Sequence, residues 1–119
     1  MLTAVILAGQ VAVTSAADDL PLVDGTLWTQ SSSLEKRTYL IGVGNLLDVE
    51  YAYQIKSGQP PSDDQTVVPR LYRGLDGMSL NEVIMHVDEW YERNPEQLDR
   101  AVLEVVWIKR VEPQDGGDR

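Results

Sequence analysis

The chain has 119 residues, which is enough for one domain but not for two. It contains no cysteine, so disulfides and thiolate chemistry are excluded. With 10 Lys and Arg residues against 19 Asp and Glu, the formal net charge is -9, which argues against binding to nucleic acids or anionic membrane surfaces and favours a basic protein partner.

The N-terminal stretch "MLTAVILAGQVAVTSAADDLP" has the character of a secretion signal. Residues 2–17 carry no charge, and their apolar run ends in the small residues Ser15, Ala16 and Ala17. This pattern predicts a signal peptide over 1–17, cut after Ala17, and a secreted or periplasmic protein. No Lys or Arg precedes the apolar run, so a buried N-terminal helix is the alternative. The run is too short for a membrane span, which needs about 20 predominantly apolar residues.

A long helix is predicted from about Ser33 to Ile55. Ser32 and Glu35 have the spacing of a capping box, in which the hydroxyl and the carboxylate each accept a backbone amide hydrogen. Gly58 and the two prolines that follow it at 60 and 61 end the helix. At helical spacing, one broad apolar stripe is expected to face the core, formed by Tyr39, Leu40, Val43, Leu46, Leu47 and Tyr53.

Two residues on this helix need a tertiary explanation. Gly42, at the edge of the stripe, costs about 1 kcal/mol relative to alanine, so we expect another helix to approach closely there. Glu50 lies inside the stripe, where a carboxylate buried alone is expensive. We expect a buried or paired carboxylate, with a partner from another helix among the tyrosine hydroxyls or Arg70, Arg73 and Arg100. Two alternatives remain for Glu50: a protonation switch, or a side chain that reaches solvent at an interface.

Further start signals follow in the second half of the chain. Residues 65–75 fit a short helix whose start is limited by Pro69. Ser79 and Glu82 form a second capping box, and the helix after it should run to about Arg93. The apolar positions of that helix lie on one side, which predicts that it packs on the core.

The last segment, residues 100–111, is ambiguous between helix and strand. Asn94, in "NPEQ", is a helix start signal. The β-branched residues of the segment suit a strand, whereas Asp99 as a cap, with Lys109 and Arg110 near the negative end of the dipole, suits a helix. Because a lone strand would have no partner in this chain, we predict a helix.

These elements predict an all-α fold, a small bundle of three principal helices with a short fourth as an option. The domain would span residues 18–113, and the polar segment 114–119 would be a disordered tail.

No constellation of residues predicts catalysis, a cofactor or a metal site. Glu82, His86 and Glu89 are close at helical spacing, but a solvated charged face is the simpler interpretation, because no second cluster of ligands exists. The Gly-x-Gly of "LIGVGNLL" lies within a helix and follows no strand, so it fails as a dinucleotide fingerprint. The chain is therefore predicted not to be an enzyme.

Aromatic residues give the one interaction signal. Trp90 lies at the edge of the apolar side of its helix, and Tyr51 lies beyond the edge of the long stripe. Such residues usually complete a core, but partly exposed tryptophan and tyrosine are also frequent anchors of protein interfaces. Tyr51 and Trp90 are therefore the candidate partner-binding residues.

Two stretches, "LEKRTYLIGVGNLL" and "VDEWYERNPEQLDRAVLEVVW", resemble known small secreted helical proteins. Their order is similar to that of the type VI secretion amidase immunity family and, more loosely, to that of the periplasmic acid-stress chaperones of the Hde type. Members of both groups typically carry a disulfide, which this chain lacks. The resemblance to the immunity family implies a periplasmic protein, often a homodimer, that plugs a peptidoglycan-cleaving effector.

Three functions follow as hypotheses. The first is a secreted or periplasmic helical protein-binding protein, in the form of an immunity protein that occludes a basic toxic amidase. The second is an acid-activated chaperone, in which titration of the 19 acidic residues exposes the apolar stripes. The third is a structural protein of the envelope.

Overall fold

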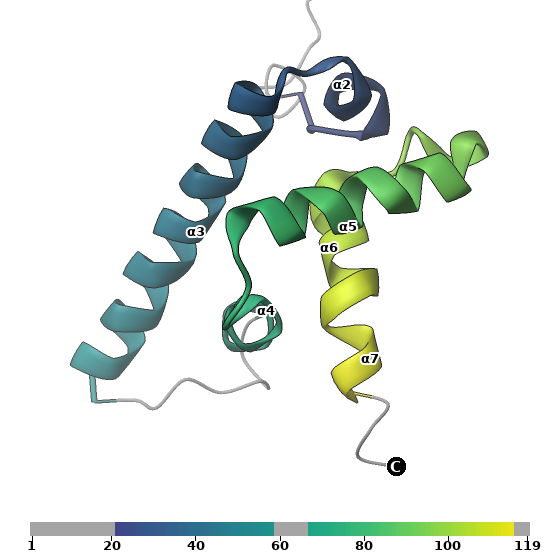
Figure 1. The fold of residues 1–119 in the computed structure, drawn as a ribbon. Coiled ribbons are helices and arrows are strands. Elements are labelled where there is room, and N and C mark those ends of the chain that lie inside the picture. The colour runs from purple at the N-terminus through teal and green to yellow at the C-terminus, as the bar shows by residue number, and fades with distance from the viewer. Residues whose placement is uncertain (1–20, 59–66, 116–119) are drawn as a thin grey trace, which may run out of the picture.

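The computed structural model describes residues 21–58 and 67–115, and these residues form helices with no strand among them (Figure 1). The predicted signal peptide, most of the Gly-Pro loop and the end of the predicted tail lie outside the described residues. In chain order the helices are α2 (Gly25–Gln30), α3 (Ser33–Lys56), α4 (Val68–Leu75), α5 (Leu80–Arg93), the 3-10 turn η3 (Pro95–Gln97), α6 (Val102–Arg110) and α7 (Glu112–Asp115). The all-α prediction is confirmed.

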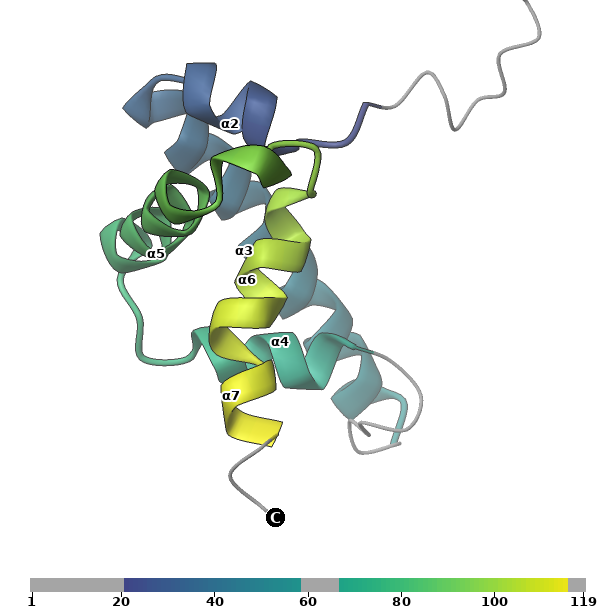
Figure 2. The same ribbon diagram turned by 90° about the vertical axis from the view of Figure 1, so that its right-hand side faces the viewer.

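The helices do not share one axis, as those of a simple bundle would. Helices α3 and α6 run in roughly similar directions, and α4 and α5 lie across them (Figures 1 and 2). Helix α3 packs on α4 and α5, while α6 packs on α4, α5 and α7. The expected bundle of three principal helices with a short fourth is not confirmed: α4 matches the short fourth helix, but α2 also takes part in the packing. No described helix has the length and apolar character needed to cross a membrane.

Both predicted capping boxes are present. The Ser32 hydroxyl accepts from the amide of Glu35 at 3.2 Å, and the Glu35 carboxylate accepts from the amide of Ser32 at 2.6 Å. Ser79 and Glu82 make the same pair of bonds at the start of α5. Each box satisfies two amides that helix geometry leaves without a partner, which explains why α3 and α5 begin where the sequence predicted.

Helix α2 was not expected, because no helix was predicted between the signal peptide and Ser33; an N-terminal lead-in, residues 21–24, precedes it. Asp24 caps it, accepting from the amide of Leu27 at 3.0 Å. The helix has only one large buried apolar side chain, Trp28, which is 1% exposed. So short a segment has no helical periodicity to detect, and its stability comes from the packing of that one indole.

The start of α6 also differs from the prediction. The helix forms, as expected, but its N-cap is Ala101 and not Asp99. The chain before α6 turns at residues 98–100 and forms an isolated bridge between Ala101 and Asp24: the amide of Val102 donates to the carbonyl of Val23 at 2.8 Å, and that of Gly25 donates to the carbonyl of Arg100 at 3.2 Å. These backbone bonds hold residues 98–101 outside the helix.

Asn94 was expected to cap a helix; it ends α5 and also occupies the N-cap position of the short 3-10 turn η3. Its side-chain amide donates to the carbonyl of Trp90 at 2.8 Å, and its backbone amide donates to that of Tyr91 at 3.2 Å, so it closes α5. Only the single turn η3 follows it, and the Asn94 side chain makes no capping bond there.

The core lies where α2, α3, α5 and α6 meet. Its buried members are Trp28, Leu40, Val83, Val87, Tyr91, Val102, Val105 and Val106. The Tyr91 hydroxyl donates to the carbonyl of Arg100 at 2.6 Å, and burial raises the pKa of that hydroxyl far above its ordinary value. The β-branched residues Val102, Val105 and Val106 belong to helix α6 and are buried in this core, so they do not form a strand.

The predicted close approach at Gly42 is wrong, because a Cβ there would meet no atom within 4 Å. The close approaches occur at two other glycines. A Cβ at Gly74 would lie 3.2 Å from the carbonyl oxygen of Arg110, where α4 meets α6. A Cβ at Gly25 would lie against the ring of Tyr91, 2.7 Å from Cδ1.

We predict that Gly25→Ala lowers the free energy of unfolding by about 1–3 kcal/mol, because the Tyr91 ring is held by its hydroxyl and has to move. Gly42→Ala is the matched control: it is expected to stabilise the protein by up to about 1 kcal/mol, since helix propensity improves and no contact is disturbed. Urea unfolding of both variants, followed by tryptophan fluorescence, measures the difference. Equal stability of the two variants would contradict the packing of α2 on α5.

Candidate functional site

Glu50, which the sequence placed on a buried stripe, is half-buried. Its Oε1 accepts a hydrogen bond from Nε2 of Gln54 at 3.0 Å, and Gln54 lies one turn further along α3. The expected partner on another helix is therefore replaced by a neighbour on the same helix. This pairing is available because glutamate and glutamine four residues apart face each other on a helix. Among the described residues no polar or charged side chain is fully buried.

The two aromatic candidates are engaged within the chain. Tyr51 stacks on Tyr72, with ring centroids 4.4 Å apart and an interplanar angle of 11°, and so joins α3 to α4. Trp90 is half-buried against the core and meets Tyr91 edge-on at 5.4 Å. The guanidinium of Arg100 lies 6.0 Å from the centroid of Trp90. Both residues thus contribute to packing within the chain, and their role in partner binding stays a prediction.

Two of the three residues weighed as a metal face, Glu82 and His86, have well-defined surroundings. The Glu82 carboxylate is already bonded to the backbone amide of Ser79, and this bond lowers its pKa. A solvated face was expected, but His86 is half-buried. Its Nδ1 has no hydrogen-bond partner in the described part of the chain. No group of three potential metal ligands occurs among the described residues.

The outer face of α3 presents apolar side chains to solvent. We define this outer α3 face as Gly42, Leu46, Val49 and Tyr53, which follow one another at helical spacing. The exposed fractions are 70% for Leu46, 67% for Val49 and 68% for Tyr53. The sequence had placed Leu46 and Tyr53 in the core stripe, and this placement is wrong.

The reason lies in how α3 is covered. Helices α4 and α5 both pack on one side of it, where Leu40 and Leu47 are buried, each with an exposed fraction of 8% (Figure 1). Apolar residues occur on the other side as well, but no described element covers them. The outer α3 face itself contains no charged residue, and Glu35 and Lys56 occupy the two ends of the helix.

A groove lies on the inner side of α3. It has an apolar compartment of about 270 Å³ with walls from four helices, among them Leu40 and Val43 of α3, Leu71 and Leu75 of α4, Val83 of α5 and Val106 of α6. A second compartment of about 220 Å³ shares Gly44 and Leu75 with the first and is lined in addition by Asp48 and Asp76. The groove is thus apolar within and acidic at one end.

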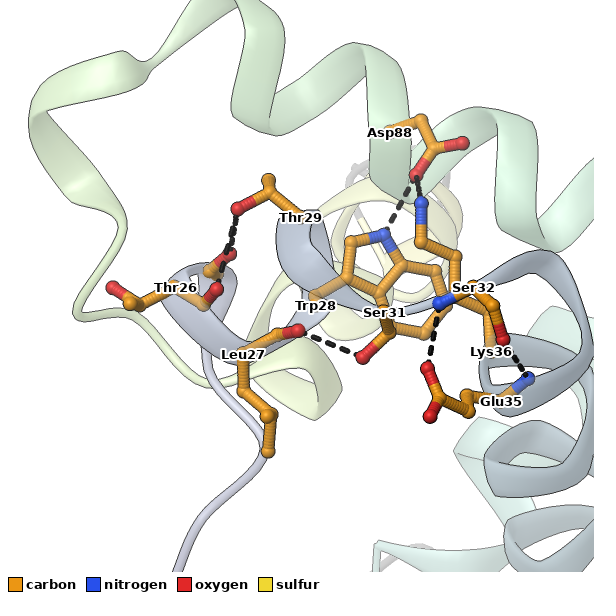
Figure 3. Close-up of polar contacts among 10 residues, drawn as sticks. Thr26, Leu27, Trp28, Thr29, Ser31, Ser32, Glu35, Lys36 and Asp88 are labelled. Atoms are coloured by element: carbon orange, nitrogen blue, oxygen red, sulfur yellow. Dashed lines mark hydrogen bonds and ion pairs between the residues drawn. The ribbon is translucent and has the colours of Figure 1, made fainter.

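A polar junction joins α2 and α3 to α5. Oδ1 of Asp88, on α5, accepts from Nε1 of Trp28 at 2.7 Å and from Nζ of Lys36 at 2.9 Å (Figure 3). The Lys36 ammonium also lies 5.2 Å from the centroid of the Trp28 ring. Sequence reasoning missed this junction, because its members are 52 and 60 positions apart and no local pattern links them.

No protein-family model matches the chain, and the curated proteins and solved structures compared with it give no match either. The resemblance to immunity proteins and acid-stress chaperones therefore stays a prediction based on the two stretches of sequence quoted above.

We predict that Asp88→Ala lowers the free energy of unfolding by about 1–3 kcal/mol, chiefly because it leaves the indole N–H of the buried Trp28 without its acceptor; the half-exposed ion pair with Lys36 adds less. Asp88→Asn should cost about 1–2 kcal/mol, since an amide oxygen can still accept from Trp28 but the charge attraction is lost. Urea unfolding measures both.

Glu92→Ala is the control, because Glu92 lies on the same helix and is exposed. A surface change of this kind is expected to stay within about 0.5 kcal/mol of wild type. If the two Asp88 variants match this control, the junction does not stabilise the fold.

Proposed function

We propose that the chain is a protein-binding protein that docks through the outer α3 face. The observation on which this depends is that Leu46, Val49 and Tyr53 are each about two-thirds exposed and lie in one line on one helix. Isolated exposed apolar residues are ordinary, whereas aligned ones on an uncharged strip are typical of interaction surfaces. Apolar side chains three and four residues apart are also the pattern with which a helix enters a groove of a partner.

Gly42 leaves space beside the backbone of α3 for a binding partner. A Cβ at this position would meet nothing, so the backbone of α3 is open to a partner at the start of the outer α3 face. The absence of a side chain allows a close approach at a position where alanine would give a more stable helix.

Charge indicates the kind of partner. A formal net charge of -9 attracts proteins with a basic surface and raises their association rate. We infer a secreted or periplasmic setting from residues 1–17, and within it an immunity protein that occludes a peptidoglycan amidase is the form of binding protein that the sequence resemblance supports. Such a protein acts by steric occlusion and performs no chemistry of its own.

We predict that Leu46→Glu weakens partner binding at least tenfold, because a carboxylate replaces an apolar contact at the centre of the outer α3 face. The tagged chain, wild type or variant, is used as bait in an envelope extract of the source organism at pH 7, and affinities are then measured with the retained protein. Leu34→Glu is the matched control, since Leu34 is 72% exposed on the same helix but lies outside the outer α3 face.

A protein retained by wild type and by Leu34→Glu but lost by Leu46→Glu supports the proposal, and a peptidoglycan hydrolase would identify an immunity protein. Retention that is equal for all three baits would exclude the outer α3 face as the docking surface. If the wild type is instead a dimer that Leu46→Glu separates, the occupant of the face is a second copy.

The acid-activated chaperone is a second candidate, favoured by the capping box at the start of α5. The backbone amide of Ser79 donates to the Glu82 carboxylate at 2.7 Å, and this bond lowers the pKa of Glu82. A group whose pKa is lower in the folded state contributes stability above its unfolded pKa and loses it as the pH falls through the folded pKa. Acidification should therefore destabilise the start of helix α5.

For this second function we predict that tryptophan emission shifts to the red between pH 7 and about pH 2, where model carboxylates are fully protonated. Trp28 would then leave its buried position, where it is 1% exposed. Glu82→Gln should flatten part of the pH dependence of the unfolding midpoint, since it removes one of the titrating groups. A compact structure with unchanged emission at pH 2 would exclude the chaperone function.

A further inference from the structure

The groove on the inner side of α3 is separate from the outer α3 face and has its own chemistry. Its apolar compartment of about 270 Å³ is bounded by α3, α4, α5 and α6, the helices whose crossing is visible in Figures 1 and 2. Protein interiors are normally packed to the density of organic crystals, so atoms that line an empty space of this size lose dispersion contacts. A molecule that fills the space would restore these contacts and stabilise the folded state.

The size of the compartment limits what can enter. Sites for drug-sized ligands commonly measure about 300–1,000 Å³, so this compartment suits something smaller. The side chains that line it, such as Leu71, Met78 and Val83, offer no hydrogen-bond donor or charge. A slender alkyl chain satisfies both conditions, because it has no polar group that would lose its hydrogen bonds to water.

The second compartment determines the charge of the ligand. It adjoins the first at Gly44 and Leu75, and Asp48 and Asp76 are among the residues that line it, with no basic residue among its described walls. Both carboxylates belong to exposed residues, so they remain hydrated until a ligand arrives. A cation near them is attracted and a carboxylate is repelled, which favours amines over fatty acids.

We propose that the two compartments form one binding site for a small cationic amphiphile, an unbranched alkyl chain with a primary ammonium group. The chain occupies the apolar compartment, and the ammonium group lies beside Asp48 and Asp76. Alkylamines and apolar side chains of a basic peptide share this chemistry in part, but the free amine fits a compartment of about 270 Å³ without an attached backbone.

Gly44 is the position that links the two compartments. It lines both of them, and a Cβ built on it would meet no atom within 4 Å. A large side chain at this position has room to extend into the site and would occupy the space that the ligand needs. Leucine also has a higher helix propensity than glycine, so the substitution is compatible with α3.

Isothermal titration of the chain with octylammonium, 1-octanol and octanoate at pH 7 tests the charge preference. We expect octylammonium to bind at least tenfold more tightly than octanoate, with octanol between them. Shortening the amine from octyl to hexyl should weaken binding about fourfold for each methylene removed. Equal affinity for amine and carboxylate would overturn the proposal, and so would the absence of amine binding at millimolar concentration.

Two sets of variants test the location. Gly44→Leu should abolish binding of octylammonium, whereas Gly42→Leu, the same substitution two residues away on the outer α3 face, should leave it unchanged. Asp48→Asn combined with Asp76→Asn should reduce the affinity for octylammonium about three- to tenfold and leave that for octanol unaltered. If Gly44→Leu fails to fold, the aspartate pair still decides the question, because both residues are exposed.

Unchanged amine binding in Gly44→Leu would place the ligand elsewhere and overturn the proposal.

The same two leucine variants separate amine binding in the groove from the proposed protein binding on the outer α3 face. Gly42→Leu alters the outer α3 face without touching the groove, and Gly44→Leu does the opposite. Failure of one function can therefore be recognised independently of the other.

Discussion

The fold depends on the burial of one indole, that of Trp28. Helix α2 has six residues, too few to be stable in isolation, and it is held by this side chain at the meeting point of α3 and α5. The hydrogen bond from the indole to Asp88 satisfies the one polar atom that burial would otherwise leave without a partner. Lys36 binds the same carboxylate oxygen and ties α3 to α5. The Trp28 ring is buried and its N–H donates to Asp88. Because the hydrogen bond fixes the direction of the N–H, the buried ring has one defined orientation.

Helix α3 then separates two surfaces of different character. Its inner side meets α4 and α5 only in part, which leaves a groove with apolar walls and two aspartates at one end. Its outer side presents Leu46, Val49 and Tyr53 to solvent. A helix of 24 residues is about 36 Å long, whereas the eight-residue α4 spans about 12 Å, so the covering elements cannot enclose it. The outer α3 face stays exposed because α4 and α5 both pack on the same side of α3.

The sequence predicted helix starts correctly where they depend on residues a few positions apart. The capping boxes at Ser32 and Ser79 act over three residues, and they set the starts of α3 and α5 as the sequence predicted. The choice of helix for residues 100–111 was also correct, although the cap at Asp99 was not. There the backbone of the N-terminal lead-in competes for the same residues, and hydrogen bonds such as that between Val102 and Val23 cannot be foreseen from either segment alone.

The sequence by itself determined the all-α class, the acidic charge and the ends of the two longest helices. The charge is a sum over the residues, and the helix ends depend on caps that act over a few positions. Only the tertiary structure decided which side of α3 is buried. Apolar residues occur around most of that helix, so its periodicity selects no single face, and the positions of α4 and α5 make the selection. For the same reason Glu50, placed by the sequence in a core stripe, lies at the edge of the packed side and bonds to Gln54.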